Sequence, residues 1–108
     1  MNFTLKRIKR LIIQGNYQFT FKAECELEAD GLLIEDALES ILNAQQIFKV
    51  INSTNPHTGK KEKLYIIQSF TYDNILIYTK GKIVEEYGVT QFYVLISSKR
   101  SLRWKEIK

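Results

Sequence analysis

The spacing of apolar residues along the chain changes from helical to strand-like at about residue 46. Before that point, apolar side chains recur every three or four positions, as they do on the buried face of an amphipathic helix. The predicted helices cover residues 3–14, 20–30 and 35–44. Thr20 can cap the second helix, and Gly15 and Gly31 are typical stops for the first and second. The N-terminal part of the chain is therefore predicted to be helical.

After residue 46, short runs rich in β-branched and aromatic residues predict strands. The predicted strands cover residues 47–52, 63–70, 74–79 and 90–98, and the third can continue to residue 84. Residues 17–19 are predicted to be only an extended link between helices. Helices followed by sequential strands indicate an α+β fold, with N-terminal helices packed on one face of an antiparallel sheet.

The length of 108 residues predicts a single domain. Within it we expect a helical part (1–45), an antiparallel sheet (46–98) and a basic tail (99–108). We expect a cytoplasmic protein without a membrane segment, because no apolar run approaches the ~20 residues of a span. The short apolar run 11–13 is too short for a signal peptide, and no small-residue cleavage site follows it.

The net charge of +4 is unevenly distributed along the chain. Residues 1–19 carry +4, residues 20–46 carry −6, residues 47–98 carry +2 and residues 99–108 carry +4. Basic patches at both ends suit a polyanionic partner such as nucleic acid, although ordinary basic proteins have them too.

The chemistry-bearing residues are cations and tyrosines at the ends of predicted strands. The segment 92–101 is typical, since an apolar strand leads into Ser97, Ser98, Lys99 and Arg100. Cations can stabilise an anionic phosphorane, and lysine or tyrosine can move protons, so such a set could cleave RNA without a metal. The candidate catalytic residues are Lys49, Lys63, Tyr65, Tyr78 and Lys99, and the candidate RNA-binding residues are Lys6, Arg10, Arg100 and Arg103.

Other reactive residues favour plainer interpretations. Because Cys25 lies between two glutamates, we expect it to be a poor nucleophile. Glu24 and Glu28 share a helix face and are either surface charges or an acid–base pair. His57, in the predicted turn 53–61, is either incidental or catalytic. One histidine and one cysteine far apart argue against a metal site, and we expect no cofactor.

Several segments together resemble the MqsR toxin family. They are the basic amphipathic helix from Leu5 to Leu11 with Gly15 after it, Thr20 with two short helices, Ile47-Phe48-Lys49, and the final run from Leu95 to Lys99. The resemblance spans residues 3–101, and RelE-like toxins such as the BrnT group share the layout. It implies a RelE-like fold, a bacterial mRNA endoribonuclease acting on or off the ribosome, and a cognate antitoxin.

The resemblance also assigns roles to residues. Lys49 matches a catalytic lysine of the family after an aromatic residue, and Lys99 matches another just past the last strand. Tyr78 corresponds to a family tyrosine in the third strand, although the following loop is longer here. A family glutamine in the second strand has Lys63 or Tyr65 in its place, with Gln68 further along.

Two other functions are compatible with the same residues. The chain can be a non-catalytic RNA- or protein-binding module on this fold, or a small basic protein without a specific partner. The partners expected under the first interpretation are mRNA and an antitoxin protein, and a homodimer is compatible with the sequence.

Overall fold

The computed structural model describes residues 2–86, 88 and 90–101 and shows an α+β fold, which confirms the predicted class. Its elements are α1 (Phe3–Ile13), β1 (Tyr17–Phe19), α2 (Phe21–Ala29), α3 (Ile34–Asn43), β2 (Lys49–Thr54), β3 (Lys61–Phe70), β4 (Leu76–Glu86) and β5 (Thr90–Arg100). The three predicted helices are confirmed to within two residues at each end. None of the described helices is both long and apolar enough to cross a membrane.

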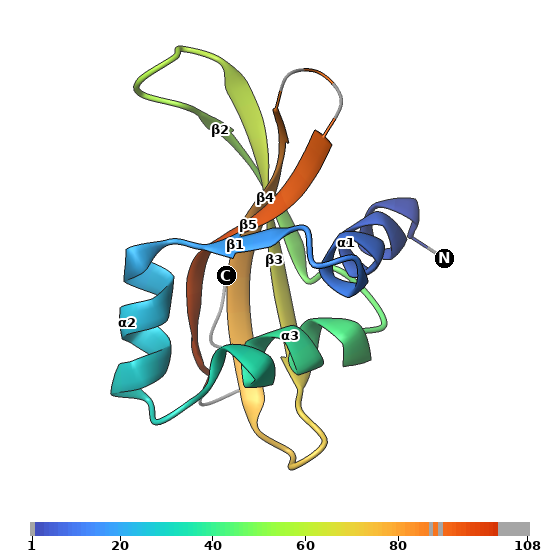
Figure 1. The fold of residues 1–108 in the computed structure, drawn as a ribbon, viewed down its shortest axis with the longest axis vertical. Coiled ribbons are helices and arrows are strands. Elements are labelled where there is room, and N and C mark those ends of the chain that lie inside the picture. Colours follow the sequence, from blue (N-terminus) through green and yellow to red (C-terminus); the bar gives the residue numbers. More distant parts are fainter. Residues whose placement is uncertain (1, 87, 89, 102–108) are drawn as a thin grey trace.

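The five strands form one sheet in the order β1-β5-β4-β3-β2 (Figure 1). Strands β2 to β5 are the predicted antiparallel meander. The prediction for residues 17–19 was wrong, because they form β1, which pairs in parallel with β5 from Tyr17 opposite Tyr93 to Phe19 opposite Leu95. Three residues give too little local pattern to identify a strand whose partner lies far along the chain. The sheet is therefore mixed, with a short parallel strand at one edge.

Two strands are longer than their predicted cores. β4 is continuous from Leu76 to Glu86, and β5 runs to Arg100, so Lys99 and Arg100 belong to the sheet and not to the tail. The register of β4 and β5 shifts between Lys80 and Gly81, which pair with Ser97 and Leu95. The extra residue, Ile96, forms a bulge, which bends the strand.

The helices cover one face of the sheet, and none of the described helices lies on the other face (Figure 1). The main core joins α1 and α3 to β3 and β5, and includes Ile8, Ile41, Ile67, Tyr93 and Leu95, all with no exposed surface. A second cluster joins α2 and α3 to β4 through Leu27, Ala37 and Ile77. The alternation of side chains along each strand therefore divides the sheet into a helix-covered face and a second face, called the open face here because no described helix lies on it. On this face Ile66, Gln68 and Ser97 are buried, whereas Lys49 and Lys99 are exposed.

The helix ends follow the predicted capping. The Thr20 hydroxyl accepts a hydrogen bond from the Ala23 N–H (3.1 Å) and donates one to the Ile96 carbonyl (3.1 Å), so it caps α2 and fastens it to β5. Gly31 follows α2 with φ of +69°, a conformation that costs a side chain energy but glycine none. At the C-terminal end of α3, the Lys9 ammonium donates to the Ala44 carbonyl at 2.6 Å. A cation at this end interacts favourably with the negative end of the helix dipole.

Beyond β1, the outer edge of β5 is covered by α2. The Ser98 N–H donates to the Glu26 carboxylate at 3.2 Å, and the Arg100 N–H donates to the Asp30 carboxylate at 2.8 Å. These acceptors take the place of a longer β1, since β1 ends at Phe19. The acidic character of α2 therefore has a structural use, because it satisfies backbone donors that an unpaired edge would expose.

Candidate functional site

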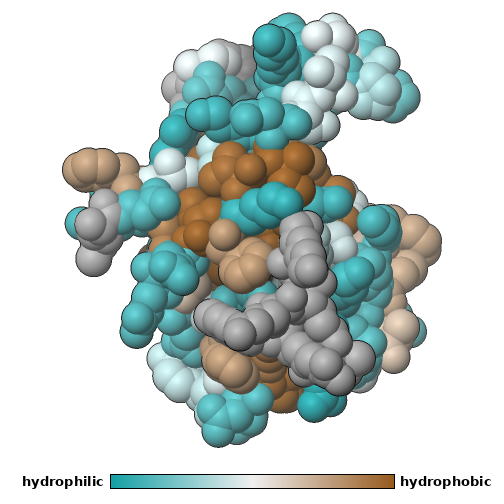
Figure 2. All heavy atoms as spheres, turned by 180° about the vertical axis from the view of Figure 1, so that it is seen from behind, coloured by the Kyte–Doolittle hydropathy of each residue, from teal (hydrophilic) through white to brown (hydrophobic). Residues whose placement is uncertain are grey.

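The register of the sheet brings basic residues from three strands onto the open face. One row across the sheet contains Lys49 on β2, Ile66 on β3, Lys80 on β4 and Ser97 on β5. Directly paired residues project to the same side of a sheet. The buried Ile67 and Thr79 lie next to this row on the helix-covered face, which places the row on the open face. Figure 2 shows this side of the molecule, where hydrophilic side chains lie around an apolar patch.

The neighbouring row on the same face contains Gln68, Tyr78 and Lys99. The Lys99 ammonium lies over the Tyr78 ring, 5.4 Å from its centroid, as in a cation–π contact. The Gln68 amide donates to the Ser101 hydroxyl at 2.7 Å. Tyr78 therefore lies between Lys99 and Gln68 in this row of the sheet.

The spacing of these lysines decides which of them can act together. Lys49 and Lys99 are three strands apart, so their backbones are separated by about 14 Å across the sheet. This separation does not favour the binding of one phosphate by both ammonium groups. Lys80 and Lys99 are diagonal neighbours on adjacent strands, with backbones about 7–8 Å apart. Lys80 was missed by sequence reasoning, although its position two residues after Tyr78 in one strand was a usable signal. Lys99 is therefore closer to Lys80, and Lys49 lies two strands beyond Lys80.

Two of the candidate catalytic residues lie on the opposite face. Tyr65 pairs with Gly81 and packs against the main core, and Lys63 lies two residues away on the same side of β3. Odd-numbered residues of this strand project towards the helices, whereas Gln68 projects to the open face. The five candidates therefore do not form one site: Lys49, Tyr78 and Lys99 share a face, and Lys63 and Tyr65 do not.

The candidate RNA-binding residues are also dispersed. Lys6 and Arg10 are exposed on α1, which packs on the helix-covered face. Arg100 is opposite Ile77, a residue of the core under α2 and α3, so it too belongs to that side of β5. Arg103 lies outside the described residues. None of the three that the structure describes adjoins the pair of Lys80 and Lys99 on the open face.

A sheet with one open face that carries cations occurs in proteins of many kinds. No protein-family model, curated protein or solved structure matches this chain. Its function is therefore inferred from the side chains of the open face and their electrostatics.

The charges on the open face are mostly uncompensated. Lys82 is paired with Glu62 at 3.1 Å. Within residues 2–86, 88 and 90–101, Lys49, Lys80 and Lys99 form no ion pair with a carboxylate. A row of cations that the fold leaves without counter-ions is typical of a surface that binds an anionic partner.

Among the described residues of this face, Tyr78 is the one whose pKa is clearly shifted. Burial raises its pKa above the usual value near 10, and the negative charge of Glu26 raises it further. Glu26 reaches the face from α2, where its Oε1 accepts a hydrogen bond from the Ser97 hydroxyl at 2.7 Å. Tyr78 therefore keeps its proton at neutral pH, which suits a hydrogen-bond or proton donor and not a base.

We expect Glu26→Gln to lower the pKa of Tyr78 towards its usual value without reaching it. The amide oxygen still accepts from Ser97 and Ser98, but the charge is lost, and burial, the larger cause, remains. The measurement is a pH titration of the Tyr78 ring by NMR, assigned with Tyr78→Phe. Glu28→Gln, on the exposed side of α2, is the control and should leave the titration unchanged. In the wild type, the pKa of Tyr78 is higher in the folded state than in the unfolded state. The free energy of unfolding should therefore fall as the pH rises from about 10 through the pKa of the folded state.

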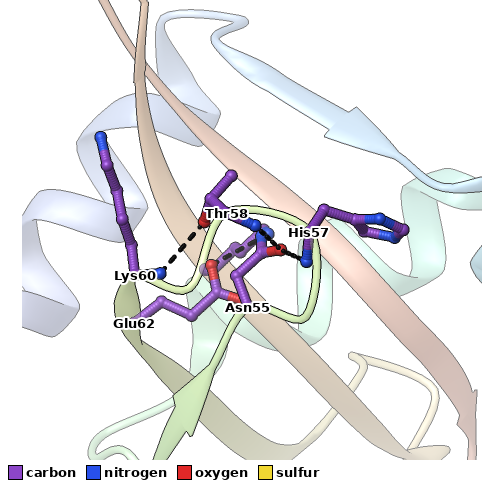
Figure 3. A network of polar contacts seen from close by, with 6 residues as sticks. Asn55, His57, Thr58, Lys60 and Glu62 are labelled. Carbon is purple, nitrogen blue, oxygen red and sulfur yellow. Dashed lines mark hydrogen bonds and ion pairs between the residues drawn. The ribbon is translucent and has the colours of Figure 1, made fainter.

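The remaining candidates have structural explanations. His57 lies at the tip of the β2–β3 hairpin, where the Asn55 side chain accepts hydrogen bonds from the N–H groups of His57 (2.8 Å) and Thr58 (3.3 Å) (Figure 3). Its ring points away from this network and is exposed. Cys25 is exposed on α2. Among the described residues, no three histidine, cysteine, aspartate or glutamate side chains come together as metal ligands would.

Proposed function

We propose that this chain is a metal-independent endoribonuclease, with a RelE-like fold, that serves as the toxin of a toxin–antitoxin pair. The observation that carries the proposal is the placement of Lys80, Lys99 and Tyr78 on one open face of a rigid sheet. Two cations about 7–8 Å apart at the backbone can converge on one phosphate, because lysine side chains are long and flexible. Tyr78, which keeps its proton at neutral pH, lies two residues before Lys80 on β4 and directly opposite Lys99 on β5.

In the proposed reaction, the ribose 2′-oxygen attacks the adjacent phosphorus and forms a new P–O bond. The bond from phosphorus to the 5′-oxygen of the next nucleotide then breaks. Lys80 and Lys99 stabilise the negative charge of the five-coordinate intermediate. Tyr78, which is protonated at neutral pH, gives its proton to the departing 5′-oxygen. The products are a 2′,3′-cyclic phosphate and a 5′-hydroxyl.

We assign the role of proton acceptor for the 2′-hydroxyl to Glu26. Its carboxylate contacts Ser97, which belongs to the same face as Tyr78, and its charge influences Tyr78. After the reaction, the proton taken by Glu26 and the one lost by Tyr78 can exchange through solvent, which restores both groups.

The resemblance to MqsR toxins supports this proposal through particular positions. Lys49, Tyr78 and Lys99, the three residues with the clearest counterparts in that family, share the open face. Gln68 also lies there, directly opposite Tyr78, and so it is a better counterpart of the family glutamine than Lys63 or Tyr65. The same resemblance is the basis for proposing an mRNA target and a cognate antitoxin.

The direct test is to incubate the purified protein with a defined single-stranded RNA in EDTA. We expect fragments with 2′,3′-cyclic phosphate and 5′-hydroxyl ends, identified by end-specific ligation or mass spectrometry. Intact RNA in the presence of folded protein would exclude the nuclease.

The second candidate is a non-catalytic RNA-binding module on the same face. It is favoured by the engagement of Glu26 Oε1 in hydrogen bonds from Ser97 and Ser98, which weakens that oxygen as a proton acceptor. Such a module would bind single-stranded RNA with a steep dependence on salt and leave it uncut.

A further inference from the structure

A polar hollow of about 650 Å³ adjoins the open face at the outer edge of β3. It lies where β2 has not yet begun, between the end of β3 and the segment that follows α3. Its lining includes Asn43, Gln45, Gln46, Gln68, Phe70 and Tyr72. Four of these six carry amides and two are aromatic.

The frame of the hollow is fixed by hydrogen bonds between α3 and β3. The Asn43 side chain donates to the Phe70 carbonyl at 3.1 Å. The Tyr72 N–H donates to the Glu39 carboxylate at 2.7 Å. These bonds hold the strand end against the helix, so the hollow is formed before any ligand arrives.

The groups that face the hollow are suited to a flat, uncharged, polar ligand. No side chain among the described lining residues is charged, in contrast to the lysines of the adjoining face. Gln45 and Gln46 are exposed and make no side-chain hydrogen bond to the described part of the chain. Tyr72 and Phe70 leave 80% and 45% of their surface exposed. Amides recognise the edges of nucleobases, and aromatic rings stack on their faces.

The hollow is continuous with the candidate catalytic residues through Gln68. Gln68 of β3 lines the hollow and is paired with Tyr78 of β4, which in turn is paired with Lys99 of β5. The backbones of Gln68 and Lys99 are two strands apart, about 10 Å. A short stretch of single-stranded RNA can therefore place a phosphate near Lys99 and a base in the hollow.

We propose that this hollow binds one unpaired nucleobase of the RNA next to the phosphate that is cleaved. Gln45 and Gln46 hydrogen-bond to the edge of the base, and Tyr72 stacks on its face. The site would give the nuclease a base preference at one position beside the cut. This inference rests on the proposed function, whose own test is cleavage in EDTA.

The test compares Gln45→Ala, Gln46→Ala and Tyr72→Ala with the wild-type chain on a pool of random single-stranded RNA. Sequencing the 5′-hydroxyl ends gives the base distribution around each cut. We expect the wild type to prefer a base at one position, and the glutamine variants to reduce this discrimination about 10- to 100-fold. Tyr72→Ala should weaken binding of the preferred RNA about tenfold, measured by fluorescence anisotropy. Gln18→Ala, an exposed glutamine of β1, is the matched control and should change neither.

The outcomes separate this inference from the proposed function. If the wild type cleaves and the three variants keep its base preference, the hollow does not read a base, while the nuclease stands. If the wild type does not cleave, anisotropy with hexamers that differ at one base still tests the hollow. Discrimination between them that the glutamine substitutions abolish supports the inference, and equal affinities for all hexamers overturn it.

Discussion

Replacing Gly81 by alanine is expected to destabilise the protein by about 2–3 kcal/mol, as overpacking of a closed core does. A β-carbon on Gly81 would lie 2.5 Å from Cζ and 2.6 Å from Oη of the Tyr93 ring. Tyr93 has no exposed surface, so its ring has no free space in which to withdraw. Alanine in a strand normally gains about 0.5–1 kcal/mol over glycine, and the clash outweighs that gain. Urea unfolding of both proteins measures the difference, and the melting temperature should fall by about 10–20 °C.

A double-mutant cycle with Tyr93→Leu tests the cause. Leucine lacks the atoms that clash, so Gly81→Ala should cost far less in that background, even though Tyr93→Leu is itself destabilising. An equal cost in both backgrounds would show that the clash with the ring is not the reason. The Tyr93 hydroxyl makes no hydrogen bond with any described group, so Tyr93→Phe should be neutral or stabilising.

The second large effect concerns activity. Lys80→Ala and Lys99→Ala are each expected to lower kcat/KM for RNA cleavage about 10²- to 10³-fold, because each removes a cation from the developing phosphorane. Lys49→Ala should have a smaller effect and act mainly on binding, because its position fits a neighbouring phosphate. The measurement is the initial rate of cleavage of a labelled RNA, together with the salt dependence of binding, whose slope should fall by about 0.7 for each lost contact.

Lys63→Ala is the matched control, since Lys63 lies on the neighbouring strand β3 but on the opposite face. It should retain the wild-type rate, and circular dichroism should show that all four variants remain folded. A loss of activity in Lys63→Ala equal to that in Lys99→Ala would refute the assignment of the site to the open face. In cells, growth arrest on expression of the wild type should be relieved by Lys99→Ala and persist with Lys63→Ala.

The helices and most of the strands could be predicted because their signals are local. Leu5, Ile8 and Leu11 repeat at helical spacing, and Thr20 and Gly31 mark the ends of α2. Alternation along β2 also places Lys49 on the opposite side from Phe48 and Val50. These features depend on a few neighbouring residues, so a single sequence contains enough information for them.

The candidate site was only partly predictable, because a face of the sheet is shared by residues far apart in sequence. Alternation along β4 can place Tyr78 and Lys80 on one side of the strand, but it does not tell which side faces the helices. It also gave no sign that Tyr65 faces the core while Gln68 faces outward beside Tyr78. The role of Glu26 could not be seen, since its partners Ser97 and Ser98 follow it by more than 70 residues.

By itself, the sequence determined an α+β chain with a basic, tyrosine-bearing sheet and an acidic second helix, because composition and periodicity are properties of neighbouring residues. Only the tertiary structure decided the parallel pairing of β1, the bulge at Ile96 and the register that sets Lys80 beside Lys99. Those depend on contacts between distant segments, such as the fit of the Tyr93 ring over Gly81. A shift of one residue in a strand would move its lysines to the other face, so register decides whether the cations form a site.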